Sequence, residues 1–126
     1  MNKIFKIIVT LSLSLIFVNF SVNANEEKIK IGLLVPMTGD DKDLGQLLIK
    51  ASMMALEDIN DKKFEIYPKD TASNPDQTLK SAIELKQMGI KIIIGPVFYK
   101  SLNYLDDIED IIFLSFTNKT LDLPKN

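Results

Sequence analysis

The sequence contains no cysteine and no histidine, and these two absences exclude several classes of protein. Without cysteine, no disulfide can form and no thiol is available for lipid attachment. Without either residue, the usual zinc sites and most pairs of nucleophile and general base are missing. Hydrolysis by a catalytic triad is excluded, and we predict no enzyme activity, no metal site and no cofactor.

Arginine is absent as well, since all 15 basic residues are lysines. No guanidinium group can therefore hold a carboxylate in a bidentate pair. An anion would have to be bound by hydroxyl groups, backbone N–H groups or ammonium groups. The 17 acidic residues outnumber the lysines and leave a net charge of −2. This mildly acidic balance argues against nucleic-acid binding, which requires clusters of basic side chains.

The beginning of the chain has the pattern of a secretory signal peptide. Lys3 and Lys6 precede an uncharged apolar run over residues 7–18, and Val22 and Ala24 are small residues at the two positions that a signal peptidase reads. A transmembrane anchor is the alternative, but the run is shorter than the roughly 20 residues that a bilayer requires. We therefore predict cleavage after residue 24, export to the periplasm, and no membrane anchor on the exported chain.

Short runs of branched apolar residues predict four buried strands, over residues 28–36, 64–67, 91–94 and 111–114. Amphipathic segments between these strands predict three helices. The order β-α-β-α-β-α-β is typical of an α/β fold with a doubly wound parallel sheet.

Local signals predict where the helices begin. Asp43 is expected to cap the first helix, with Gln46 completing a capping box, and its apolar face to comprise Leu44, Leu47, Leu48, Ala51, Ala55 and Ile59. Asn74 is expected to cap the second helix, with Pro75 in its first turn. The third helix should direct Leu102, Leu105 and Ile108 inward.

In a parallel sheet, ligands bind beyond the carboxyl ends of the strands, near the switch point in strand order. The rule selects four loops, over residues 37–43, 70–74, 96–101 and 115–120. Hydroxyl groups in the first and the last of these loops make Thr38, Ser115 and Thr117 candidate ligand contacts.

Two other features of these loops have alternative interpretations. Gly39 and Gly45 would suit an anion cradle at a helix N-terminus, or they simply permit a turn and a close approach of the helix. The aspartates of the first loop are better explained by a solvated acidic loop with an N-cap than by a metal site.

Four motifs resemble those of the type I periplasmic binding proteins, which include the leucine/isoleucine/valine-binding proteins that feed ABC transporters. The motifs are IKIGLLVPMTGDDKDLGQ, ALEDIN, KDTASNP and IIIGPVFYKS, and they follow the family's order and spacing between about Lys28 and Thr120. The resemblance implies two lobes that close on a ligand. We expect residues 25–126 to be a truncated, partial N-terminal lobe of such a protein.

This resemblance also implies a function and further site residues. The function is that of the solute-binding component of an ABC-type uptake system for amino acids or similar small carboxylates, with a small-molecule ligand and an ABC permease as partners. In the family, a serine three residues after the proline of the Gly-Pro motif commonly binds the ligand carboxylate. Here Tyr99 has that position, and Ser101 is the nearest hydroxyl alternative. Because one lobe offers only an open shelf, we expect no micromolar binding by this chain alone.

A divergent branch of the family leads to an alternative function. The Gly95-Pro96 pair with Lys100-Ser101, and the run over residues 114–118, are similar to penicillin-binding-protein activators. This similarity implies a regulator that contacts a cell-wall synthase instead of carrying a solute. Activators of this kind are usually lipoproteins, and the missing cysteine counts against such an anchor. The sequence leaves both functions open.

Overall fold

The structure of the chain, a computed structural model, describes residues 27–116, so the predicted signal peptide and Thr117 lie outside the described residues. The elements in chain order are β1 (Ile29–Val35), α2 (Lys42–Ile59), β2 (Phe64–Asp70), α3 (Pro75–Gln87), β3 (Ile92–Ile94), a 3-10 helix η2 (Tyr99–Tyr104) and β4 (Ile112–Leu114). The four strands form one sheet in the order β2-β1-β3-β4, and every pair is parallel. The predicted α/β fold with a parallel sheet is confirmed.

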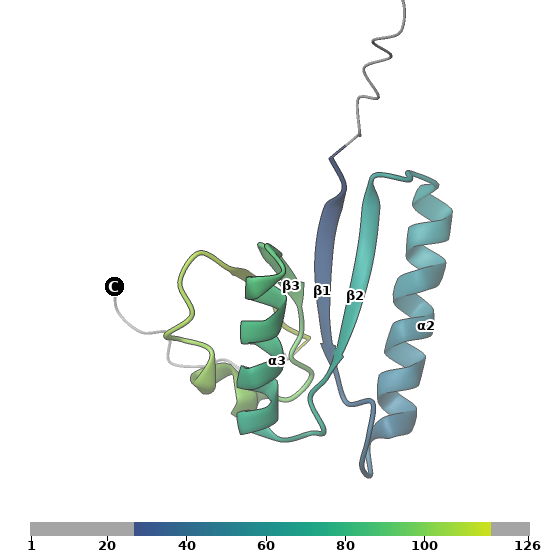
Figure 1. Cartoon of the computed structure of the whole chain (residues 1–126). Helices are drawn as coiled ribbons and strands as arrows, with labels where there is room; N and C mark the ends of the chain where they lie inside the picture. The colour runs from purple at the N-terminus through teal and green to yellow at the C-terminus, as the bar shows by residue number, and fades with distance from the viewer. Residues whose placement is uncertain (1–26, 117–126) are drawn as a thin grey trace, which may run out of the picture.

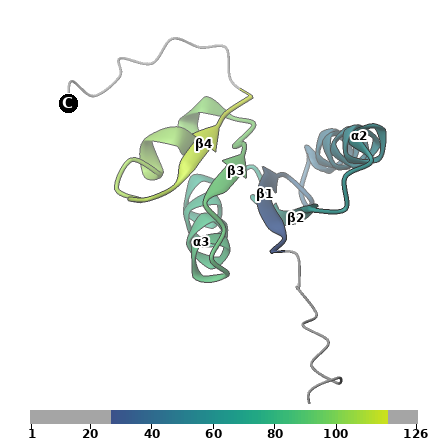
Figure 2. The ribbon, with the colours of Figure 1, turned by 90° about the horizontal axis from the view of Figure 1, so that it is seen from above.

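The helices lie on opposite faces of this sheet (Figure 1, Figure 2). α2 packs against β1 and β2 on one face, whereas α3 and η2 pack together on the other. The main hydrophobic core comprises Leu34, Ala82, Leu85, Ile90, Ile93 and Leu105, and it lies between the sheet and α3. At the outer edge of the sheet, β2 contains Pro68, which an edge strand tolerates because one of its sides needs no ladder hydrogen bond.

The predicted start of α3 is confirmed. The Asn74 side chain accepts a hydrogen bond from the Gln77 backbone N–H at 3.0 Å, and Pro75 is the first helical residue. At the other end, Gly89 has a φ of +78°, a conformation that glycine adopts at little cost. Both signals act within a few residues of sequence, which is why they could be read without the fold.

The predicted start of α2 is wrong. The helix begins at Lys42 after Asp41, whose side chain makes no capping bond, so Asp43 lies inside the first turn. The Asp41 carboxylate instead accepts a hydrogen bond from the Ser73 hydroxyl at 2.6 Å. The Asp41 carboxylate thus bonds to the loop after β2 and does not cap the backbone N–H groups at the start of α2.

The predicted apolar face of α2 is also wrong in part. The side against the sheet is centred on buried Gly45, with Leu48, Ile49, Ser52 and Leu56 half-buried beside it. A Cβ atom on Gly45 would lie 1.6 Å from the carbonyl oxygen of Pro36. The glycine therefore permits close approach of the helix to the chain leaving β1, and Leu47, from the predicted face, is 66% exposed.

The third predicted helix is a 3-10 helix of six residues. Leu105 is nevertheless buried, and Ile108 packs against the core, so these two inward positions are confirmed. The chain turns after Leu105 through a stretch rich in aspartate, a poor helix former, and Asp110 has a φ of +63°.

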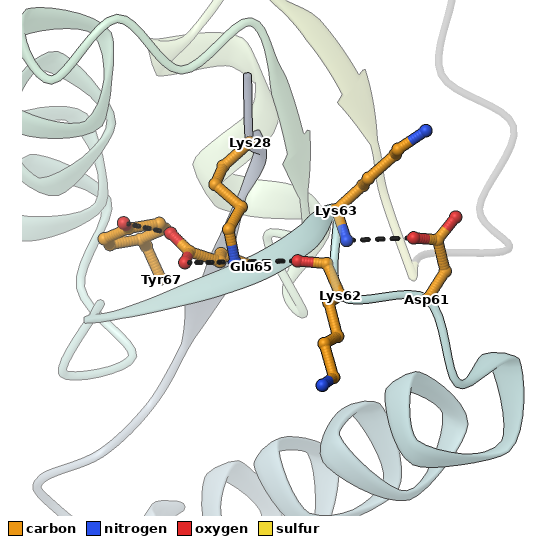
Figure 3. A network of polar contacts seen from close by, with 6 residues as sticks. All are labelled: Lys28, Asp61, Lys62, Lys63, Glu65 and Tyr67. Carbon is orange, nitrogen blue, oxygen red and sulfur yellow. Dashed lines mark hydrogen bonds and ion pairs between the residues drawn. The ribbon is translucent and has the colours of Figure 1, made fainter. Parts of the chain in front are cut away.

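A network of polar side chains joins β1 to β2 near the amino-terminal ends of the strands (Figure 3). Lys28 Nζ lies 3.2 Å from a Glu65 carboxylate oxygen and donates to the Lys62 carbonyl at 2.7 Å. The Tyr67 hydroxyl donates to Glu65 at 2.8 Å; this bond and the one with Lys28 lower the pKa of Glu65. Because the ion pair is exposed, it contributes little to stability. The network joins β1 to β2 at the end of the sheet opposite the loops selected above.

Candidate functional site

Asp70 organises the carboxyl ends of β1 and β2. Its Oδ1 accepts hydrogen bonds from the backbone N–H groups of Met37 at 2.7 Å, Thr38 at 3.2 Å and Ala72 at 2.8 Å. Its Oδ2 accepts one from the Thr38 hydroxyl at 2.6 Å. One carboxylate therefore joins the loop after β1 to the loop after β2.

These hydrogen bonds decide the ionisation of Asp70. Burial raises the pKa of the carboxyl, but the bonds from the Thr38 hydroxyl and from the three backbone N–H groups outweigh burial, and the net pKa lies below its usual range. The carboxylate therefore stays charged at neutral pH. We did not select Asp70 from the sequence, although an aspartate that ends a strand before a Thr-Ala-Ser-Asn turn is a recognisable signal for such a clasp.

A pocket of about 250 Å³ lies among the loops that follow β1, β2 and β3, and we call it the loop pocket. It is lined by Asp41, Ser73, Pro75, Phe98, Tyr99, Lys100 and Ser101. The pocket thus combines two aromatic rings with one acidic and one basic side chain. Of the predicted ligand residues, it brings together Tyr99 and Ser101.

The Ser101 side chain is buried. Ser101 is only 2% exposed, and its hydroxyl lies 3.3 Å from the Thr78 hydroxyl of α3. Thr78 in turn donates to the Asn74 carbonyl at 2.8 Å. The Ser101 hydroxyl therefore fixes η2 against α3 and is not aimed at the solvent-facing side of the pocket.

The other predicted residues lie elsewhere. Thr38 lines a separate, wider pocket of about 720 Å³ beside Asp70 and the start of α3. The Ser115 hydroxyl donates to the Pro96 carbonyl at 3.1 Å, which ties the end of β4 to the end of β3. Thr117 lies outside the described residues. The predicted residues therefore do not converge on one point, apart from Tyr99 and Ser101.

Two further pockets are lined by other parts of the described chain. A pocket of about 310 Å³ lies between the end of α2 and the start of β2, and one of about 320 Å³ lies along α3. Within residues 27–116, no cluster of three or more potential metal-ligating side chains occurs. No helix in the same range is long and apolar enough to span a bilayer.

Comparison with known proteins relates this arrangement to a family. Residues 28–123 match the family model described as periplasmic binding protein. No curated protein shows significant similarity to the sequence.

Three of the solved structures that match the chain illustrate the shared fold. A solute-binding protein of an ABC transporter from Rhodopseudomonas palustris BisB5, in complex with 3,4-dihydroxybenzoic acid, is 30% identical with a TM-score of 0.58, covering 62% of this chain and 23% of its own. The branched-chain amino acid transporter substrate-binding protein LivJ from Streptococcus pneumoniae, in complex with isoleucine, is 22% identical with a TM-score of 0.56, covering 62% and 24%. The LpoA C-domain from Haemophilus influenzae, a regulator of PBP1A, is 25% identical with a TM-score of 0.57, covering 71% and 28%. The matched region is thus about a quarter of each of these proteins.

Proposed function

Because the chain belongs to the periplasmic binding protein family, we propose that residues 25–126 form part of an N-terminal lobe that receives a small carboxylate solute for an ABC-type uptake system. The predicted signal peptide would deliver this lobe to the periplasm. The loop pocket carries the proposal, because it lies at the carboxyl ends of the strands, where ligands bind in open α/β sheets.

The side chains of the loop pocket suit an amino acid or a related acid. Phe98 and Tyr99 offer apolar and aromatic contact, while Lys100 and Asp41 supply one charge of each sign. Lys100 can attract a carboxylate, and Asp41 can attract an ammonium group. Two solved relatives hold isoleucine and 3,4-dihydroxybenzoic acid, which are both small carboxylates.

The pocket forms only one wall of such a site. Its volume of about 250 Å³ is below the range of roughly 300–1,000 Å³ that encloses a ligand. Each hydrogen bond on an open shelf contributes about 0.5–1.5 kcal/mol net. Two or three of them fall short of the roughly 8 kcal/mol that micromolar binding requires. We therefore expect millimolar dissociation constants for this chain by itself.

Titration by nuclear magnetic resonance tests the proposal, because it detects binding in the millimolar range. Isoleucine and 3,4-dihydroxybenzoate should shift the backbone amide signals of Phe98, Tyr99 and Lys100. Tyr99→Ala should reduce these shifts. Tyr104→Ala is the matched control, since Tyr104 is a second tyrosine of η2, exposed to solvent, that does not line the pocket. Shifts spread evenly over the chain, or equal loss in both variants, would contradict the proposal.

A second function is favoured by one observation. The match with the LpoA C-domain covers 71% of this chain, whereas each of the two transport proteins covers 62%. On this alternative, the chain binds a cell-wall synthase through a protein surface and carries no solute. Immobilised PBP1A-type synthase should then retain the chain, and the solute titration should give no shift in the loop pocket. Retention of the chain without any solute response would favour the alternative.

A further inference from the structure

The acidic side chain of the loop pocket is fixed at one of its two oxygens. Asp41 is half-buried, and its Oδ2 accepts the hydrogen bond from the Ser73 hydroxyl at 2.6 Å. Within residues 27–116, the Asp41 carboxylate makes no further hydrogen bond and no ion pair. One oxygen of a fixed carboxylate therefore stays available to a donor that enters the pocket.

Asp70 holds both partners of this contact in place. Its carboxylate accepts a hydrogen bond from the backbone N–H of Ala72, next to Ser73, at 2.8 Å, and one from the hydroxyl of Thr38, in the loop that leads to Asp41, at 2.6 Å. Ala72 and Ser73 have left-handed φ values of +47° and +53°, which persist only where surrounding contacts maintain them. Two side-chain links thus join the loop after β1 to the loop after β2, and they position Asp41 before a solute arrives.

The basic side chain of the loop pocket is not fixed in this way. Lys100 is exposed, and within the described part of the chain no hydrogen bond or ion pair holds its ammonium group. Binding a carboxylate through Lys100 would immobilise a long side chain, which loses more rotamer freedom than most others. The group that attracts a cation is therefore better organised than the group that attracts an anion.

We propose that the loop pocket selects its solute by an ammonium group, and that Asp41 is the residue that recognises it. This inference rests on the proposed function and narrows the solute from small carboxylates in general to those that carry an ammonium group. The physical reason is preorganisation, because binding to a group that is already held in position costs less freedom than binding to a mobile one. Of two compounds that each carry one charged half of an amino acid, the amine should bind more tightly than the acid.

Solvent limits the size of this preference. An ion pair on an open shelf is partly hydrated and is screened by salt. We therefore expect a difference of about three- to fivefold between the two dissociation constants at low salt. The difference should shrink in about 1 M salt, where the Debye length is only about 3 Å.

Three compounds with the same branched side chain test the inference on the full chain. They are isoleucine, 2-methylbutylamine, which lacks the carboxylate, and 3-methylpentanoate, which lacks the ammonium group. In titrations followed by nuclear magnetic resonance, the amine should shift the amide signals of Ser73, Phe98 and Tyr99 and bind about three- to fivefold more tightly than the acid. This comparison needs no substitution, so it does not depend on the folding of a variant.

The outcomes separate this inference from the proposed function. Equal binding of the amine and the acid, or tighter binding of the acid, would overturn the inference, while shifts in the loop pocket with isoleucine would still support the proposed function. If none of the three compounds shifted the signals of the loop pocket, both would be overturned.

Asp41→Asn tests the role of the charge. Asparagine keeps a side-chain oxygen that can accept the Ser73 hydrogen bond, but it has no charge to attract an ammonium group. The variant should bind 2-methylbutylamine about three- to fivefold more weakly and lose the preference for the amine over the acid. Circular dichroism verifies that it folds.

Asp40→Asn is the matched control. Asp40 precedes Asp41 in the same loop and is exposed, but it does not line the pocket. Its substitution removes the same charge from a chain whose net charge is −2, so it measures how far overall charge attracts the amine. Amine binding by Asp40→Asn should stay close to that of the wild type. An equal loss in both variants would show that Asp41 is not the recognising residue and would overturn the inference.

Discussion

The two faces of the sheet are built from equally apolar strands but differ in cover. Under α3 and η2, Leu85 and Ile93 are fully buried. On the α2 face, Leu114 and Ile112 are as hydrophobic as their counterparts yet remain more than half exposed. Hydropathy alone therefore does not determine what is buried in this chain. The position of one helix relative to the strands divides the apolar residues into core and surface.

The largest difference between the faces should appear on truncating leucines. Leu85→Ala should lower the free energy of unfolding by about 2–5 kcal/mol, because it leaves a cavity in the closed core. Leu114→Ala should cost less than about 1 kcal/mol, since most of that side chain is already in water. Urea denaturation at low protein concentration, where self-association contributes little, measures both. Equal losses would show that the α2 face is covered after all.

A second substitution tests the close packing of α2 against the chain that leaves β1. Gly45→Ala places a Cβ atom 1.6 Å from the Pro36 carbonyl oxygen, so α2 must shift away from β1. We expect a loss of about 1–3 kcal/mol in the free energy of unfolding, as in other overpacked sites. Gln46→Ala, at the next and exposed position, is the control and should change little. Thermal melts followed by circular dichroism compare the two, and an unchanged Gly45→Ala midpoint would contradict the close contact.

The caps of the two helices provide a smaller contrast. Asn74→Ala should cost about 0.5–2 kcal/mol, because the side-chain bond to the Gln77 N–H is lost at the start of α3. Asp43→Ala should leave stability nearly unchanged, since the α2 helix begins one residue earlier and Asp43 caps nothing. Denaturant midpoints distinguish the two substitutions. A larger loss of stability for Asp43→Ala than for Asn74→Ala would support the start of α2 that was predicted from the sequence.

The smallest expected effect concerns Asp70, whose carboxylate joins the loop after β1 to the loop after β2. The pKa of Asp70 is lower in the folded chain than in the unfolded chain, so the native state binds fewer protons. Its contribution to stability is present above the unfolded pKa of about 3.9 and is lost as pH falls through the lower folded pKa. Urea denaturation of the wild type and of Asp70→Asn between neutral and acidic pH should show a weaker acid dependence in the variant. Parallel curves would mean that Asp70 has no part in acid destabilisation.

Several features could be predicted because their physical causes are local. The alternation of apolar runs and amphipathic segments was sufficient for the parallel α/β order, and the strand positions were predicted to within a few residues. The start of α3 depends on Asn74, Pro75 and Gln77, which lie within four consecutive residues. These features need no information about distant parts of the chain.

The errors have the opposite cause, since each involves a contact between distant residues. Asp41, and not the predicted Asp43, precedes α2, and its carboxylate bonds to Ser73, 32 positions away, instead of capping the helix. The burial of Ser101, whose hydroxyl lies 3.3 Å from that of Thr78 across the fold, was likewise beyond sequence reasoning, while its ligand contact stays a prediction. The turn after Asp70 is visible in the sequence, but the bonds of Asp70 to Met37 and Thr38 come from another strand's loop and could not be predicted from that turn.

The sequence by itself determined the elements, their order and the parallel class of the sheet, because periodicity and capping act over a few residues. Tertiary structure alone decided which apolar residues are covered. α2 has apolar residues on more than one side, and helical periodicity cannot choose between sides of similar hydrophobicity. The close approach at Gly45 makes that choice by turning the Leu48 and Leu56 side toward the sheet and leaving Leu47 in solvent.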